Sequence, residues 1–267
     1  MPQFIVQGGT PLKGEISIGG SKNAALPILA ATLLATTPST LHNVPDISDV
    51  HAFLKILSGL GADVSFDAGT VTVNPSRVAS AQIDPSLVKH MRASILLLGP
   101  LLARFLEVDL AFPGGCVLGK RSVHAHLHAL TKLGASIIES DESIHLKAAA
   151  LQPANIIMAE ASVTATENAV MAAVLIPGET TIRWAAMEPH VQDLCHFLQK
   201  MGADISGVGT PTLTIQGGKP LTGVEYSVTA DYLEAGTLAL AAVLTNGDVR
   251  IKNCPVEHLD SFWQKLE

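Results

Sequence analysis

Leu60-Gly61-Ala62-Asp63 decides the fold, because it ends a helical pattern and opens a pair of strands over residues 64–73 in which apolar and polar residues alternate. The same pattern recurs at Leu133-Gly134-Ala135-Ser136 and at Met201-Gly202-Ala203-Asp204. A glycine at this position suits the left-handed conformation in which many helices end. The three stretches therefore indicate an internal repeat.

The repeat extends upstream of each glycine. Every copy begins with an alanine-rich apolar helix, continues with a strand, and returns through a second helix to the Gly-Ala pair. The expected first helices and strands are Asn23–Leu34 with Thr40–Asn43, Met91–Phe105 with Glu107–Ala111, and Thr166–Leu175 with Glu179–Trp184. Such units pack helices against sheets, so the predicted class is α/β, with the three units closing into one domain.

A fourth copy begins at Asp231. Its expected elements are a helix over Tyr232–Leu244, a strand over Asp248–Lys252 and a helix over Val256–Leu266, after which the chain ends without a Gly-Ala pair or hairpin. Two strands expected at Phe4–Gln7 and Glu15–Ile18 resemble the hairpin that this copy lacks. We therefore expect a C-terminally truncated chain, with one complete domain at 21–229 and an incomplete second domain made of 1–20 and 230–267.

Composition narrows the classes of partner. The 267 residues are 48% apolar and 15% charged and carry a net charge of −7 without a basic run, so neither nucleic acid nor an anionic membrane is an expected partner. The N-terminus lacks the pattern of a signal peptide, and the apolar stretches are too short to span a bilayer. Three widely spaced cysteines form neither a disulfide framework nor a zinc pattern. We expect a cytoplasmic protein that uses no metal and no cofactor.

A cysteine in a glycine-rich loop is the first candidate for chemistry. Pro113-Gly114-Gly115-Cys116 follows the strand expected at Glu107–Ala111, and Lys120 and Arg121 come shortly after it. Neighbouring cations lower the pKa of a thiol and favour the reactive thiolate. Free cysteines are also often small buried residues, so a packing role for Cys116 is the alternative.

The alanine-rich helices begin with polar or basic residues. Gly19-Gly20-Ser21-Lys22-Asn23 opens the first, where backbone N–H groups and a lysine suit an anion, although an ordinary helix start with a solvated lysine explains it equally well. Arg92 lies in the apolar second helix and needs a partner there, which a buried structural ion pair would also supply. Ser162-Val163-Thr164 opens the third, where Ser162 or Thr164 can cap the helix and the N-terminus is a second anion site.

Three histidines follow the cysteine loop on one expected helix. His124, His126 and His128 are spaced so that they do not all share one helix face. We therefore interpret this segment as a surface helix and not as a metal site.

Four stretches together resemble the UDP-N-acetylglucosamine enolpyruvyl transferase family of bacterial cell-wall synthesis. They are Gly20-Ser21-Lys22-Asn23-Ala24-Ala25-Leu26-Pro27, Met91-Arg92-Ala93-Ser94, Pro113-Gly114-Gly115-Cys116 and Asp231–Thr237. The resemblance covers the whole chain, and the joint order of the motifs is specific. It implies an inside-out α/β barrel, in which two similar domains of three repeated α/β units each enclose the active site.

The resemblance also implies an activity and a set of site residues. Members of the family transfer the enolpyruvyl group of phosphoenolpyruvate to the 3-hydroxyl of UDP-N-acetylglucosamine and release phosphate, the first committed step of peptidoglycan synthesis. Cys116 would be the general acid toward the vinyl carbon, which suits a thiol of tunable pKa. The implied substrate-binding residues are Lys22 and Arg92 for phosphoenolpyruvate, Asn23 for the sugar, Arg121 for phosphate groups, Ser122, Val123 and His124 for the nucleotide, and Ser162, Val163 and Thr164 for the diphosphate. This chain alone is expected to be inactive, because further catalytic residues of the family lie beyond Glu267.

The sequence departs from the family pattern mainly around the nucleotide. The departures are His124 for an aspartate that contacts uracil, Glu160 where some members have a lysine, Thr164 for a glycine, and Tyr232 for an arginine. Two other interpretations stay open. One is an enzyme similar to 5-enolpyruvylshikimate-3-phosphate synthase, against which the Cys116 loop argues. The other is a nucleotide-sugar-binding module without catalysis.

Overall fold

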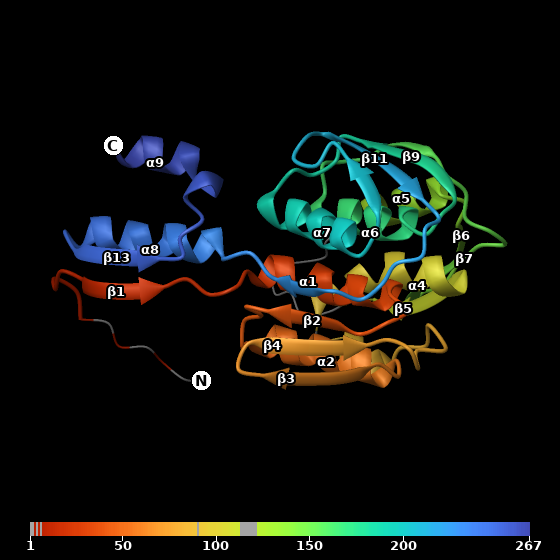
Figure 1. Cartoon of the computed structure of the whole chain (residues 1–267), viewed down its shortest axis with the longest axis horizontal. Helices are drawn as coiled ribbons and strands as arrows, with labels where there is room; N and C mark the ends of the chain where they lie inside the picture. Colours follow the sequence, from red (N-terminus) through yellow and green to blue (C-terminus); the bar gives the residue numbers. More distant parts are fainter. Residues whose placement is uncertain (1–2, 4, 6, 90, 113–121) are drawn as a thin grey trace.

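The computed structural model describes residues 3, 5, 7–89, 91–112 and 122–267. It is mixed α/β, as the sequence predicts, with short sheets arranged around a group of helices (Figure 1). A smaller group of elements lies to one side and is joined to the rest by two extended segments. This group consists of β1 (Lys13–Ser17), α8 (Tyr232–Leu244), β13 (Asp248–Lys252), the 3₁₀ turn η3 (Val256–His258) and α9 (Asp260–Leu266).

The larger part of the molecule contains the three predicted copies in the predicted order. The first copy contains α1 (Lys22–Ala31), η1 (Thr32–Leu34), β2 (Ser39–His42), α2 (Ser48–Gly59), β3 (Asp63–Asp67) and β4 (Thr70–Asn74). The second contains α3 (Pro85–Val88), η2 (Arg92–Leu97), α4 (Leu98–Phe105), β5 (Glu107–Ala111), α5 (His124–Lys132), β6 (Ser136–Ile138) and β7 (Ser143–Lys147). The third contains β8 (Asn155–Ile157), α6 (Val163–Ala173), β9 (Gly178–Arg183), α7 (Pro189–Lys200), β10 (Asp204–Ser206) and β11 (Thr212–Gly217), and is followed by β12 (Glu225–Ser227).

The glycines that mark the repeat lie at the ends of the outer helices, as expected. Gly61, Gly134 and Gly202 have φ angles of 100°, 102° and 111°, a conformation that is strained for a residue with a β-carbon. Each is followed by an antiparallel hairpin, and the second hairpin strand pairs with the central strand of its copy, β4 with β2, β7 with β5, and β11 with β9. Hairpin and central strand therefore form one sheet in each copy.

The free edge of a central strand is usually covered by a further parallel strand, which the sequence pattern does not predict. β8 pairs with β9, β12 with β2, and β1 with β13. In the second copy a single bridge between Gln82 and Asp109 takes this place. Strands β8 and β12 have three residues each, which is too short for a recognisable alternation.

The expected N-terminal hairpin is wrong. Within the expected strand over Phe4–Gln7 the structure describes residues 5 and 7, and neither lies in a strand. The second expected strand exists as β1, but it pairs in parallel with β13, with Lys13 opposite Asp248 and Ser17 opposite Lys252. β1 therefore holds beside β13 the position that β12 holds beside β2.

The segment that follows β1 crosses the segment that follows β12. Ser21 N donates to Thr229 O at 2.8 Å, and Asp231 N donates to Gly19 O at 2.9 Å. Gly20 lies between these bonds, where a β-carbon would stand 1.6 Å from the carbonyl oxygen of Asn43. Only glycine fits this close approach to the Asn43 backbone, and the two hydrogen bonds hold the chain before α1 beside the chain before α8.

Two expected helices are divided. The expected helix over Met91–Phe105 begins as the six-residue 3₁₀ helix η2, and α4 starts at Leu98. Pro100 has no N–H and is tolerated in the first turn of an α-helix, which accounts for a start at this point. The expected helix over Val256–Leu266 is divided at Leu259 into η3 and α9.

Helices α1, α4 and α6 lie inside the larger part and the sheets lie outside them. Residues 24–31 of α1 and 165–173 of α6 are all buried, which fits their alanine-rich composition. α4 and α6 approach so closely that a β-carbon on Gly99 would stand 2.4 Å from the carbonyl oxygen of Asn168. Among the described residues, no helix combines the length and apolarity needed to cross a membrane.

Candidate functional site

The residues predicted to bind substrates lie largely at the starts of central helices. Lys22 is the first residue of α1, Arg92 the first of η2, and Val163 the first of α6. These elements pack against one another, α1 against η2 and α6, and η2 against α6. Cys116 and Arg121 lie outside the described residues.

Two of these helix starts have no side-chain cap within the described part of the chain. Ser21 precedes α1 and Ser162 precedes α6, yet neither hydroxyl bonds to a backbone N–H, and neither helix has an acidic residue in its first turn. The expectation that Ser162 or Thr164 caps α6 is therefore wrong. Asp231, by contrast, caps α8. Uncapped N–H groups and the helix dipole make the starts of α1 and α6 suited to an anion.

Lys22 forms a weak ion pair at the first of these starts. Its Nζ lies 3.2 Å from Asp49 Oδ2, and the two side chains are 45% and 48% exposed. Exposed pairs of this kind contribute about 0–1 kcal/mol to stability. Lys22 can therefore exchange Asp49 for a bound anion at little cost. Asn23, the next residue, is half-buried.

Arg92 connects η2 with the residues before α5. Its Nη2 donates to Ser122 O at 3.4 Å, and Ser122 Oγ accepts from the N–H of His124 at 3.1 Å. Ser122 and His124 are exposed and Val123 is half-buried. The structure thus brings Arg92 and residues 122–124 together.

A buried hydrogen-bond network joins this cluster to α6. His126 Nε2 lies 3.1 Å from Thr164 Oγ1, and His126 Nδ1 lies 3.0 Å from Asn168 Nδ2. Asn168 is fully buried and also bonds to Ile95 O and Gly99 N. Burial, with a smaller effect of the Arg92 charge, lowers the pKa of His126 to about 4, so this imidazole is neutral near pH 7.

His126 and Asn168 are parts of this cluster that sequence reasoning missed. The interpretation of residues 124–132 as a surface helix is wrong for His126, which is 3% exposed. A signal was present, because His126 precedes Ala129 and Leu130 by three and four residues, the spacing of one buried helix face. Asn168 likewise directly precedes the apolar residues 169–173 of α6.

Glu167 is a buried carboxyl on the same helix. It is 1% exposed, and its Oε1 has no hydrogen-bond partner among the described residues. Burial, and then the charge of Glu188, raise the pKa of Glu167 well above its ordinary value. Folding therefore favours the protonated acid, so stability decreases as pH rises from the unfolded-state pKa toward the folded-state pKa.

We expect Glu167→Gln to stabilise the protein at alkaline pH. The amide keeps the shape of the neutral acid but never ionises, and each unit of pKa elevation corresponds to about 1.4 kcal/mol. The free energy of unfolding should therefore rise near pH 8 and change little near pH 4. Urea unfolding at both pH values measures this, with the exposed Glu160→Gln as control. Equal effects at the two pH values would contradict the assignment.

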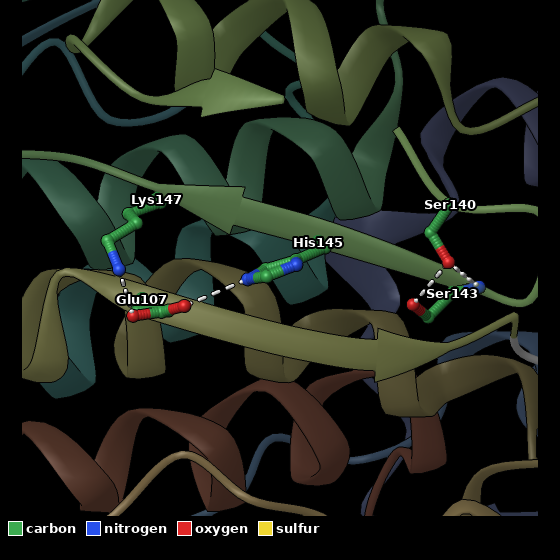
Figure 2. Close-up of polar contacts among 5 residues, drawn as sticks. All are labelled: Glu107, Ser140, Ser143, His145 and Lys147. Atoms are coloured by element: carbon green, nitrogen blue, oxygen red, sulfur yellow. Dashed lines mark hydrogen bonds and ion pairs between the residues drawn. The ribbon is translucent and has the colours of Figure 1, made fainter. Parts of the chain in front are cut away.

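A groove of about 1120 Å³ lies at another place, on the outer face of β5 and β7, and none of the described site residues predicted above lines it. Its walls are those strands and parts of segments 79–89 and 140–145. Figure 2 shows Glu107 between His145 and Lys147, to which it bonds at 3.0 Å and 2.8 Å. The bonds to Lys147 and His145 hold the pKa of Glu107 below its usual value. Cross-strand pairing on a sheet surface explains this cluster.

Comparison with known proteins agrees with the resemblance seen in the sequence. A UDP-N-acetylglucosamine 1-carboxyvinyltransferase of Borrelia garinii subsp. bavariensis is 46% identical over 97% of this chain and 60% of its own length. One of Methylacidiphilum infernorum is 46% identical over 100% of this chain and 64% of its own length. The chain thus spans 60–64% of the length of these curated relatives.

Solved structures and a family model lead to the same assignment. The enolpyruvyl transferase NikO from Streptomyces tendae has a TM-score of 0.84 at 25% identity, over 97% of this chain and 62% of that one. An EPSP synthase from Acinetobacter baumannii, at 20% identity, shares the fold with a TM-score of 0.69, over 87% of this chain and 53% of that one. The family model described as EPSP synthase matches residues 6–267. With its repeated α/β units and helices inside the sheets, the chain belongs to the EPSP synthase (3-phosphoshikimate 1-carboxyvinyltransferase) family.

Proposed function

We propose that this chain takes part in transferring the enolpyruvyl group of phosphoenolpyruvate to the 3-hydroxyl of UDP-N-acetylglucosamine, with release of phosphate, in peptidoglycan synthesis. The observation that carries the proposal is the 46% identity to UDP-N-acetylglucosamine 1-carboxyvinyltransferases over 97–100% of the chain. Both substrates are anions. The starts of α1, η2 and α6 support the proposal because they combine two cations with uncapped helix N-termini.

The proposed substrate-binding roles are those that the resemblance implies, and the chemistry of these starts suits them. Lys22 and Arg92 hold the phosphate and carboxylate of phosphoenolpyruvate, because cations form charge-assisted hydrogen bonds with both groups. Asn23 contacts the sugar, Arg121 contacts phosphate, and residues 122–124 contact the nucleotide. Ser162, Val163 and Thr164 hold the diphosphate through backbone N–H groups at the start of α6.

Cys116 is proposed as the general acid of the reaction. It donates its proton to the vinyl carbon of phosphoenolpyruvate, and its sulfur can form a covalent adduct with the same substrate. Lys120 and Arg121 follow it closely in sequence, and such cations stabilise the thiolate that remains.

We also propose the domain division expected from the repeat, with residues 21–229 as one unit and residues 1–20 with 230–267 as part of a second. The crossing near Gly20 supports it. β1 pairs with β13 of the second unit and β12 pairs with β2 of the first, so both boundaries between the units fall at this crossing.

Product analysis tests the proposed transfer. The chain is mixed with phosphoenolpyruvate and UDP-N-acetylglucosamine, released phosphate is measured, and mass spectrometry identifies the enolpyruvyl ether. Calorimetry measures nucleotide-sugar binding in parallel. Product formed only with shikimate 3-phosphate as acceptor would favour the sister activity. Because this chain alone is expected to be inactive, binding of UDP-N-acetylglucosamine without transfer is the expected result. Turnover would show that the chain carries the whole activity, and absence of binding would contradict the proposal.

The cysteines give a chemical test of the Cys116 assignment. We expect an epoxide phosphonate that resembles phosphoenolpyruvate to alkylate Cys116 in preference to the other two. Burial, and then the charge of Glu167, raise the pKa of Cys195 to about 12, and burial with the charge of Glu257 raises the pKa of Cys254, so both thiols are poor nucleophiles near pH 7. Peptide mapping locates the label, and Cys116→Ser should abolish it. Equal labelling of all three would overturn the assignment.

A further inference from the structure

We infer that His126 is a positioning residue that makes the Thr164 hydroxyl a hydrogen-bond donor toward the diphosphate of UDP-N-acetylglucosamine. The inference rests on the proposed function and extends it to two side chains. Thr164 is the second residue of α6, and His126 is on the buried face of α5. Their contact is what connects the buried network to the start of α6.

The orientation of the Asn168 amide fixes the hydrogen bonds of the network. The N–H of Gly99 donates at 2.6 Å to one side of the amide, which must therefore be its oxygen. The amide nitrogen then faces Ile95 O at 3.0 Å, Thr164 O at 3.1 Å and His126 Nδ1 at 3.0 Å. The two amide hydrogens are shared among these three neighbours, and the amide nitrogen itself only donates. A proton on Nδ1 of His126 would point at this N–H group without an acceptor, so Nδ1 carries no proton.

The tautomer of His126 follows from this. A neutral imidazole with an unprotonated Nδ1 has its proton on Nε2, which therefore donates to Thr164 Oγ1 at 3.1 Å. Protonation of Nδ1 would turn one N–H toward another, and the nearby charge of Arg92 opposes it further. His126 therefore presents a fixed donor to Thr164.

The Thr164 hydroxyl is left with a proton to donate. Its acceptor role is taken by His126, and among the described residues its hydroxyl proton has no acceptor. Thr166 provides the contrast on the same helix, because its hydroxyl both donates to Ser162 O and accepts from Ala186 N. Thr164 is also half-buried, whereas Thr166 is fully buried.

A diphosphate at the start of α6 would accept a hydrogen bond from the Thr164 hydroxyl. The uncapped N–H groups of the first turn attract an anion to this place, and the hydroxyl adds one directed donor. Removing a hydrogen bond to a charged group lowers affinity roughly 10- to 100-fold. A histidine that accepted from Thr164 instead would compete with the diphosphate for the same proton.

Calorimetry with UDP-N-acetylglucosamine tests the role of the hydroxyl. We expect Thr164→Val to weaken binding roughly 10-fold or more, and Thr164→Ser, which keeps the hydroxyl, to restore most of it. Thr131→Val is the matched control, because Thr131 is a half-buried threonine of α5 whose hydroxyl donates to His128 O. It should bind as the wild type does. Equal binding by Thr164→Val would overturn the inference while leaving the proposed function intact.

Two further measurements test the role of His126. Nitrogen-15 NMR of labelled histidine should show His126 as the Nε2–H tautomer near pH 7, and the Nδ1–H tautomer would overturn the inference whatever the binding results. In a double-mutant cycle, Thr164→Val should cost little extra affinity once His126→Leu is present, because the two residues act through one hydroxyl. Full additivity would contradict this. A wild-type chain that binds no UDP-N-acetylglucosamine would remove the proposed function itself.

Discussion

Asn168→Leu should lower the free energy of unfolding by about 3–5 kcal/mol, at the upper end of what single substitutions cause. Leucine has a similar branched shape but makes no hydrogen bond. It leaves the N–H of Gly99, the carbonyl of Ile95 and the Nδ1 of His126 without their present partner. All three residues are buried, and each unsatisfied buried group costs roughly 1–3 kcal/mol. Urea unfolding followed by circular dichroism measures the change.

Thr166→Val is the matched control for this prediction. Thr166 lies on the same helix, is equally buried, and its hydroxyl makes two hydrogen bonds, to Ser162 O and from Ala186 N. Valine has nearly the same volume but removes the partner of the Ala186 N–H and of the Ser162 carbonyl. We expect this to lower the free energy of unfolding by about 1–2 kcal/mol. If both variants lost the same stability, Asn168 would not be the central tie between α4, α5 and α6.

Local features of the sequence predicted most of the fold. The strand Glu107–Ala111 and the alanine-rich helix Tyr232–Leu244 have the bounds expected from the repeat pattern. The three Gly-Ala stretches identified the repeat because a left-handed helix end is a property of a few adjacent residues. Such features need no knowledge of distant partners.

Elements that exist only through distant partners were not predictable in this way. β8 and β12 are recognisable as strands because β9 and β2 lie beside them. The pairing of β1 with β13 joins the two ends of the chain across the crossing at Gly20. Nothing in residues 13–17 specifies whether they pair with a hairpin neighbour or with a strand more than two hundred residues away in sequence.

The candidate site was predictable in its charges but not in its supporting contacts. Lys22 and Arg92 stand out because cations are unusual at the starts of apolar helices, and the structure places both there. Their substrate roles stay predictions. The cap expected from Ser162 or Thr164 was wrong, and the Thr164 hydroxyl bonds instead to His126 on another copy of the repeat. That contact depends on the packing of α5 against α6, which no local pattern specifies.

Lys22→Met should separate binding from stability. The ion pair with Asp49 is half-exposed, so its loss should change the free energy of unfolding by less than about 1 kcal/mol. The substitution also removes the charge-assisted hydrogen bond that Lys22 would form with a bound phosphonate or phosphate group. Such a bond is worth roughly 1.5–3 kcal/mol, which corresponds to about a 10- to 100-fold weaker interaction. We therefore expect alkylation of Cys116 by the epoxide phosphonate to slow by about that factor at subsaturating reagent.

Lys219→Met offers a control with nearly the same local chemistry. Lys219 Nζ lies 3.2 Å from Asp204 Oδ2, and the two side chains are 59% and 54% exposed, so this pair matches that of Lys22 in distance and in solvent screening. Lys219 belongs to no helix start, and its removal should leave the alkylation rate unchanged. Equal slowing in both variants would show that general electrostatic attraction of the phosphonate explains the effect. If only Lys22→Met slows alkylation, the effect depends on the position of this lysine at the start of α1, because the two variants remove the same charge from similar ion pairs.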